Sequence, residues 1–197
     1  ALGLRLGLNP CEPHECPCGV QVDARGTHGM SCRRSSGRTL RHFQINDLIW
    51  RALSRAGIPS VKEPSGLSRS DGKTLVPWQR GKSLIWDVTV VDTLAASHLS
   101  TTSTQAGGAA QTASLNKEQK YAELSRVHTF IPIACETLGP IDPKAMKFLQ
   151  ELGGRIAAVT GDSRETSFLL QRLSVCVQRY NSVCFQGSFV EVHDIEG

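Results

Sequence analysis

The chain has 197 residues, a formal net charge of +4 and seven cysteines, and 40% of its residues are hydrophobic. This length can bury a hydrophobic core, and no stretch approaches the roughly 18 consecutive apolar residues of a membrane span, so we expect a soluble chain with no membrane partner. The cysteine count is odd and four cysteines crowd the N-terminus, which argues against a disulfide framework and favours a reducing, intracellular environment. The first ten residues lack the features of a signal peptide, and the missing initial Met fits a segment of a longer polypeptide.

A set of soft metal ligands lies in the first sixth of the chain. These ligands form the array C-x-C-x9-H-x3-C and are Cys16, Cys18, His28 and Cys32. Three thiolates and one imidazole complete a tetrahedral zinc shell, with Cys11 and His14 as spare candidates. The alternative is a reduced, metal-free cluster or stray disulfides. Because so small a knuckle has almost no core, its folding free energy should come largely from a structural zinc ion.

Basic residues follow this array and continue into a predicted helix. They are Arg33, Arg34, Arg38 and Arg41, with His42 next to the last of them. A basic run beside a zinc knuckle suits the phosphate backbone of a nucleic acid better than an acidic or apolar partner. Apolar residues recur at helical spacing over residues 40–56, and Gly57 with Pro59 ends the run. We therefore expect an amphipathic helix next to a nucleic-acid-binding surface.

Three strands are predicted in the next forty or so residues. Residues 60–64 and 74–78 are short strand candidates around a turn at residues 66–72, and residues 79–82 form a hairpin turn. Residues 83–92 are apolar on both faces, as in a central strand. Asp87 interrupts this strand, and a buried carboxylate is costly unless a metal, a cation or solvent lies beside it.

The second half of the chain alternates helical and strand patterns. Residues 93–114 have the composition of a mobile loop that could cover a site, residues 116–126 look helical and residues 128–137 form an apolar strand. Asp142 is predicted to cap a helix that runs to about residue 159, although two adjacent glycines within it weaken its continuity. Asp162 and Glu165 resemble a capping box for a last helix to about residue 179. The element order predicts an α/β fold with a small mixed sheet.

Acidic residues on successive sheet elements, followed by two lysines, outline the chemistry of a metal-dependent nuclease. They are Glu63, Asp71 and Asp87, and then Lys117 and Lys120. Carboxylates can hold a divalent cation against a phosphate, and a lysine can stabilise the charge that develops there. Taken singly, Glu63 could be a solvated strand end, Asp71 a turn residue before glycine and the lysines an ordinary helix surface.

The order and spacing of these motifs resemble the restriction-like endonuclease region of site-specific non-LTR retrotransposons, a PD-(D/E)xK-type nuclease preceded by a Cys/His knuckle. The resemblance covers about residues 11–180. It is carried by the zinc array, by Arg41-His42 with Asn46, by Arg69-Ser70-Asp71, by the strand segment from Trp86 to Val90, and by the segment from Lys117 to Tyr121.

This resemblance implies a restriction-endonuclease-like fold, with a small mixed sheet flanked by helices behind an N-terminal zinc knuckle. Residues 1–36 would form the knuckle with its arm, residues 37–185 the nuclease domain and residues 186–197 a tail. Asp71 and Asp87, with Glu63, would hold a catalytic Mg²⁺ or Mn²⁺. Thr89 occupies the usual lysine position, so either Lys117 or Lys120 would substitute for it.

The family's activity would make this chain a nuclear endonuclease domain that nicks target DNA, so that the free 3′-hydroxyl primes reverse transcription. Its partners would be DNA, the element RNA and the reverse transcriptase region of the same polyprotein. Ser70 stands where the family has proline, which leaves a catalytically inactive, zinc-containing nucleic-acid-binding module as the alternative. A cysteine enzyme is disfavoured because Cys135 and Cys176 have no recognisable general base nearby.

Overall fold

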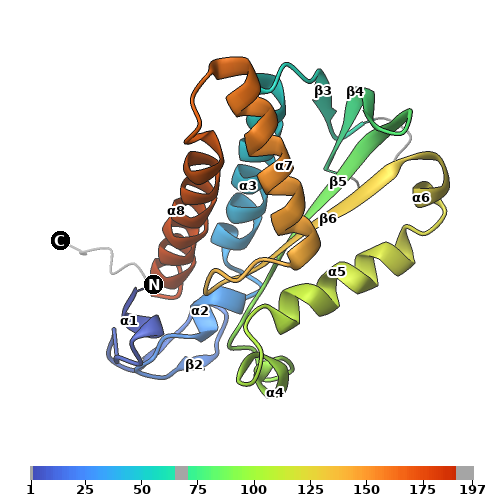
Figure 1. Ribbon diagram of the computed structural model, residues 1–197. Coiled ribbons are helices and arrows are strands. Elements are labelled where there is room, and N and C mark those ends of the chain that lie inside the picture. Colours follow the sequence, from blue (N-terminus) through green and yellow to red (C-terminus); the bar gives the residue numbers. More distant parts are fainter. Residues whose placement is uncertain (1, 65–70, 190–197) are drawn as a thin grey trace, which may run out of the picture.

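The computed structural model describes residues 2–64 and 71–189, and its centre is a four-stranded mixed sheet flanked by helices (Figure 1). The strands are β3 (Ser60–Lys62), β4 (Gly72–Gln79), β5 (Lys82–Val91) and β6 (Thr129–Glu136), in that order across the sheet. Only β5 and β6 pair in parallel; the other neighbours are antiparallel. The predicted α/β class with a small mixed sheet and a central strand at residues 83–92 is confirmed.

Three long helices form the main core with one face of the sheet. They are α3 (Ser36–Arg55), α7 (Pro143–Thr160) and α8 (Glu165–Gln186). Leu84, Trp86 and Val88 of β5 belong to this core. Because side chains alternate along a strand, the intervening Asp87 points away from that core, toward α5 (Gly108–Lys120). None of the helices within the described residues is both long and apolar enough to cross a lipid bilayer.

Local sequence signals account for several element boundaries. The hairpin between β4 and β5 turns at Arg80 and Gly81. Both residues have positive φ, as a two-residue type I′ turn requires. The Asp142 side chain accepts hydrogen bonds from the backbone N–H groups of Lys144 and Ala145, at 3.0 and 3.1 Å, and so caps α7 as expected. The turn expected at residues 66–72 lies mostly outside the described residues. Arg69 and Ser70, which carry part of the family resemblance, lie outside them entirely.

The prediction of a mobile loop over residues 93–114 is wrong, because much of this segment is helical. It contains α4 (Leu99–Thr102) and the first half of α5, which ends at Lys120 and is followed by α6 (Leu124–Val127). One oxygen of Glu136 accepts the backbone N–H groups of Ala109 and Ala110 at 3.1 and 3.4 Å. These small residues are buried, so a distant strand residue fixes the start of a helix that composition alone does not indicate.

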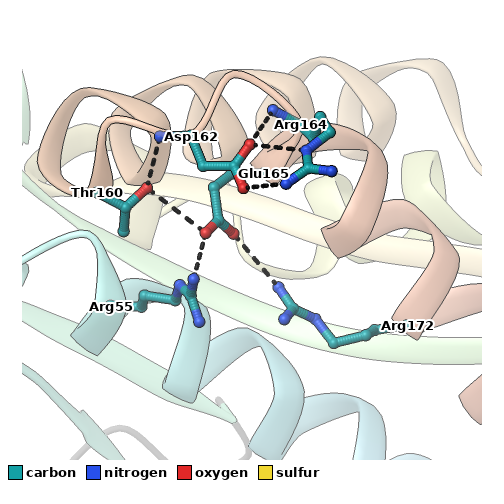
Figure 2. A network of polar contacts seen from close by, with 6 residues as sticks. All are labelled: Arg55, Thr160, Asp162, Arg164, Glu165 and Arg172. Atoms are coloured by element: carbon teal, nitrogen blue, oxygen red, sulfur yellow. Dashed lines mark hydrogen bonds and ion pairs between the residues drawn. The ribbon is translucent and has the colours of Figure 1, made fainter.

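The predicted capping box at residues 162–165 is also wrong. Asp162 accepts the backbone N–H of Arg164 at 2.9 Å, but Glu165 turns inward instead of reaching back along its own helix. Figure 2 shows its carboxylate between Arg55 of α3 and Arg172 of α8. The last helix runs to Gln186, beyond the expected end near residue 179, and the helix after the knuckle starts at Ser36, before the expected residue 40.

The N-terminal segment is docked on the end of α8. It comprises α1 (Leu2–Arg5), the two-stranded sheet of β1 (His14–Glu15) and β2 (Gln21–Val22), and α2 (His28–Ser31). A β-carbon at Gly29 would come within 3.0 Å of the Cys184 carbonyl oxygen, and the His14 and Phe189 rings stack with centroids 4.1 Å apart. The start of the expected tail therefore packs against this segment, and residues 190–197 lie outside the described part of the chain.

Candidate functional site

The four predicted zinc ligands meet in one cluster. One ligand atom from each of Cys16, Cys18, His28 and Cys32 lies within 4.8 Å of the other three. The Cys16 and Cys32 sulfurs are 3.7 Å apart, close to the edge of about 3.8 Å that a tetrahedral site with zinc–sulfur bonds of about 2.3 Å requires. Cys18 Sγ and His28 Nε2 are 3.2 Å apart. The donor set and its spacing fit a structural zinc ion.

Burial controls the protonation state of one ligand. It raises the pKa of the Cys16 thiol to about 11, so Cys16 keeps its proton at neutral pH unless a metal ion displaces it. The spare candidates lie elsewhere: the Cys11 thiol donates to the Ala24 carbonyl oxygen at 3.4 Å, and His14 Nε2 is 3.0 Å from the Ser188 hydroxyl. Neither belongs to the metal-ligand groups found among residues 2–64 and 71–189.

A second group of potential ligands lies beside the sheet and consists of His42, Asp71 and Asp87. One ligand atom from each lies within 4.8 Å of the others. Asp71 and Asp87 are buried, at 8% and 3% exposure, and His42 is half-buried. This geometry brings together the two aspartates predicted from the sequence and adds a histidine that the sequence had indicated only for nucleic-acid contact.

Asp71 is held by its neighbours on three sides. One carboxylate oxygen accepts the backbone N–H of Val88 and lies 3.1 Å from His42 Nε2. Asn46 donates from its amide to the Asp71 carbonyl oxygen at 3.2 Å, and the same amide accepts the Trp86 indole N–H at 2.8 Å. Asn46 is therefore a positioning residue that joins α3 to both acidic strand segments.

The pKa values of His42 and Asp87 are both raised, but for different reasons. The hydrogen bond to Asp71 raises the pKa of His42, and the nearby Asp87 charge adds to the effect. Burial raises the pKa of Asp87, although Lys117 opposes that shift. Lys117 thus supplies the positive charge beside the Asp87 carboxylate, and a divalent cation bound there would have to replace that contact.

The structure distinguishes the two candidate lysines. Lys117 Nζ lies 2.5 Å from Asp87 Oδ2, whereas Lys120 is exposed and lies over the Tyr121 ring at 5.2 Å from its centroid. Glu63 is exposed with a positive φ of 48° and belongs to neither potential metal group. The expected trio of Glu63, Asp71 and Asp87 is thus not brought together; the structure places His42 beside the aspartates instead.

An open hollow of about 630 Å³ gives access to this group. His42, Asp71, Asp87 and Lys117 line it together with Arg33, Arg38 and Arg41. Arg41 is only 2% exposed and donates to Asn181 at 2.6 Å, yet no carboxylate of the described residues lies within 4 Å of its guanidinium. Arg34 does not line the hollow and donates instead to the Pro17 carbonyl oxygen. The hollow therefore combines a possible cation site with cationic groups suited to a phosphate.

No protein-family model matches the chain. A search of curated proteins finds no match either. The geometry of the two ligand groups and of the hollow therefore carries the functional interpretation.

Proposed function

We propose that this chain is a metal-dependent DNA endonuclease domain of the kind found in non-LTR retrotransposons, with a structural zinc ion in its N-terminal knuckle. The observation that carries the proposal is the convergence of Asp71, Asp87 and Lys117 in one hollow lined by arginines. Phosphodiester cleavage needs these three components: ligands for a divalent cation, a positive charge beside the phosphate and a surface that holds the nucleic acid.

Asp71, Asp87 and His42 would hold a catalytic Mg²⁺ or Mn²⁺. Two carboxylates suit either ion, and the imidazole favours Mn²⁺, because Mg²⁺ prefers an all-oxygen shell. When bound, the cation would polarise the scissile phosphate and lower the pKa of a coordinated water. The protein's own contribution is to keep Asp71 in place through Asn46 and Val88 and to keep both carboxylates in a largely buried setting.

The arginines and Lys117 would act on the nucleic acid. Arg33 and Arg38 are exposed at the rim and would contact backbone phosphates. The buried Arg41 lacks an acidic partner among the described residues, so a phosphate oxygen would complete its hydrogen bonding. Lys117 would move from Asp87 toward the phosphate as charge develops there. In this proposal the nick supplies a 3′-hydroxyl for reverse transcription of element RNA in the nucleus.

A non-catalytic nucleic-acid-binding module is the second candidate. Two observations favour it. Lys117 contacts the Asp87 carboxylate oxygen that would otherwise be free to bind a metal, and Glu63 lies outside the group of potential ligands. Both proposals predict zinc in the knuckle and a basic hollow. They differ in whether the aspartates exchange Lys117 for a divalent cation.

Nicking of supercoiled plasmid at low salt separates the two candidates. With Mg²⁺ or Mn²⁺, the wild type should produce open circles, and Asp71→Asn or Asp87→Asn should lower the rate at least about 100-fold. Glu63→Gln is the matched control, because it removes an acidic charge outside the ligand group and should leave nicking intact. A wild type that binds DNA and zinc but never nicks would favour the non-catalytic module.

A further inference from the structure

A second cationic surface lies in a groove between α3 and α8, on a different face of α3 from the candidate site. The groove has a volume of about 570 Å³, and Leu48, Val175 and Cys176 line it with apolar side chains. A smaller hollow of about 230 Å³ shares Leu48, Arg51 and Arg172 with it and extends the groove toward Arg55. None of the residues used in the proposed nuclease site lines either hollow.

Arginines dominate the charge of this groove. They are Arg51 and Arg55 on α3 and Arg172 and Arg179 on α8. Asp47 is the one acidic residue that lines the described groove, and Arg51 and Lys62 already contact it at 2.5 and 2.9 Å. The side chains of Arg51, Arg55 and Arg172 remain 73%, 49% and 46% exposed, so most of their donors are open to a ligand.

A buried carboxylate lies between two arginines at one end of the groove. Glu165 is 1% exposed, forms an ion pair with Arg55 and lies 3.9 Å from Arg172 (Figure 2). One of its oxygens has no hydrogen-bond partner in the described structure. Glu165 thus holds Arg55 through a direct ion pair, whereas Arg172 is close enough for charge attraction but forms no hydrogen bond with it. Both arginine side chains keep about half of their surface exposed, so their planar forks can still donate to phosphate oxygens.

Aromatic rings accompany the arginines. Phe168 and Tyr180 line the groove from α8, twelve residues or about 18 Å apart along the helix, and both are half-buried. The Arg164 guanidinium lies over the Phe168 ring at 5.1 Å from its centroid, so a base would stack on the other ring face. Aromatic rings beside arginines are the combination that binds single-stranded nucleic acids, because bases stack on the rings and phosphates pair with the guanidinium groups. A duplex keeps its bases stacked inside and cannot use such rings.

Adjoining hollows connect the groove with the candidate site. A hollow of about 440 Å³ shares Phe43 with the nuclease hollow and shares Gln44, Asp47 and Arg51 with the groove. Phe43 is 49% exposed at this junction. The three hollows therefore adjoin one another around α3, and the connecting hollow carries both acidic (Asp47, Glu63) and basic (Arg51, Lys62) side chains.

We propose that the groove between α3 and α8 binds single-stranded nucleic acid through Arg51, Arg172 and Arg179, with bases stacked on Phe168 and Tyr180. The relation to the nuclease hollow rests on the proposed function, but binding itself needs no catalysis. Single-stranded DNA and RNA both offer the phosphates and bases that this groove would recognise, so separate DNA and RNA probes are needed to tell which of the two ligands binds.

The test measures binding of fluorescent oligo-dT and oligo-U to the full chain by anisotropy, without divalent cations and over a range of KCl concentrations. Arg51→Gln/Arg172→Gln/Arg179→Gln should weaken binding of at least one probe more than about tenfold and reduce the salt slope by about 2, since each phosphate contact on a single strand contributes about 0.7. A duplex probe should be affected less.

The matched control is Arg80→Gln/Lys147→Gln/Arg126→Gln, which removes the same charge from exposed positions outside the groove. Equal losses in both triple variants would overturn the proposal, because they would indicate a general charge effect. Because Arg172 also contacts Glu165, the double variant Arg51→Gln/Arg179→Gln guards against misfolding and should reduce the slope by about 1.4. Unchanged binding in a folded double variant would also overturn it.

Two further measurements separate this proposal from the nuclease proposal. Asp87→Asn should lose nicking and keep the groove-dependent binding of oligonucleotides, because Asp87 lines neither hollow of the groove, and this result would support both proposals. A wild type that never nicks but shows the arginine-dependent slope would refute the nuclease and support the groove. Binding of an acidic helical peptide in the groove with no arginine-dependent oligonucleotide binding would refute the groove as a nucleic-acid site.

Discussion

The ammonium group of Lys117 lies 2.5 Å from a carboxylate oxygen of Asp87, whereas Lys120, one helical turn away on α5, is exposed. Both ammonium groups also lie over the Tyr121 ring, at 5.9 and 5.2 Å from its centroid. Helix phase alone thus gives two lysines of one short segment different environments. Only Lys117 lines the hollow that contains Asp71, Asp87 and His42.

Substitution of these lysines tests their roles. Lys117→Met should lower the nicking rate about 100-fold or more, because it removes the positive charge beside the proposed phosphate position. Lys120→Met should leave the rate unchanged and alter the free energy of unfolding by less than about 0.5 kcal/mol. Plasmid nicking and thermal unfolding measure both effects. Equal losses of nicking in the two variants would remove the assignment of Lys117.

Asp87→Asn should make the metal-free protein more stable at neutral pH. Burial raises the pKa of Asp87 above its ordinary value of 3.8, so the folded state binds a proton more readily than the unfolded state. Stability is therefore lost as the pH rises from 3.8 through the folded pKa, and the loss is complete above it. Asparagine carries no such penalty, and the Tm difference from wild type should shrink below pH 4.

The control for this stability effect is Asp162→Asn. Hydrogen bonds from Arg164 lower the pKa of Asp162, so its ionised form is favoured in the folded state and its removal should not raise the Tm. A lower Tm for Asp87→Asn than for wild type at pH 7 would indicate that the ion pair with Lys117 outweighs the burial of Asp87.

Zinc content should depend on the four clustered ligands, Cys16, Cys18, His28 and Cys32. The purified wild type should hold about one equivalent of zinc, and Cys16→Ser should lose it, because Cys16 is a buried member of the ligand cluster. Cys176→Ser is the control outside the cluster and should keep the metal. Elemental analysis measures the metal, and a chelator should lower the Tm, since the knuckle packs against the end of α8. Full zinc in Cys16→Ser would contradict the site.

Adjacent glycines in α7 give a matched test of helix packing. A β-carbon at Gly153 would come within 2.5 Å of the Thr166 hydroxyl oxygen on α8, whereas one at Gly154 would meet nothing within 4 Å. Gly153→Ala should destabilise the fold by about 1 to 3 kcal/mol through overpacking. Gly154→Ala should stabilise it by about 0.5 to 1 kcal/mol, because alanine favours the helix. Urea unfolding of both variants measures the difference, and two similar effects would contradict the close contact of α7 and α8.

Features set by local chemistry could be predicted from the sequence. The turn at Arg80 and Gly81, the Asp142 cap and the four-ligand cysteine array depend on residues that are neighbours in the chain or on a known ligand spacing. The buried position of Asp87 also followed from its strand, because apolar residues surround it on both sides. These signals require no knowledge of distant contacts.

Features set by distant contacts could not be predicted. The helical start at Ala109 depends on Glu136, which is 27 residues away, and the inward turn of Glu165 depends on Arg55, which is 110 residues away. The choice of His42 over Glu63 as the neighbour of the aspartates depends on how α3 packs beside β5. The available signal in the sequence was a histidine next to Arg41 in a predicted amphipathic helix, and that pair indicates phosphate contact as readily as a metal ligand.

The most direct test of the central claim is the rate of nicking of supercoiled plasmid by the zinc-loaded protein with Mg²⁺ or Mn²⁺, compared between wild type, Asp87→Asn and Glu63→Gln. The account predicts divalent-dependent nicking by wild type and Glu63→Gln, and a loss of at least about 100-fold in Asp87→Asn with unchanged zinc content. Nicking by folded Asp87→Asn at the wild-type rate would contradict it.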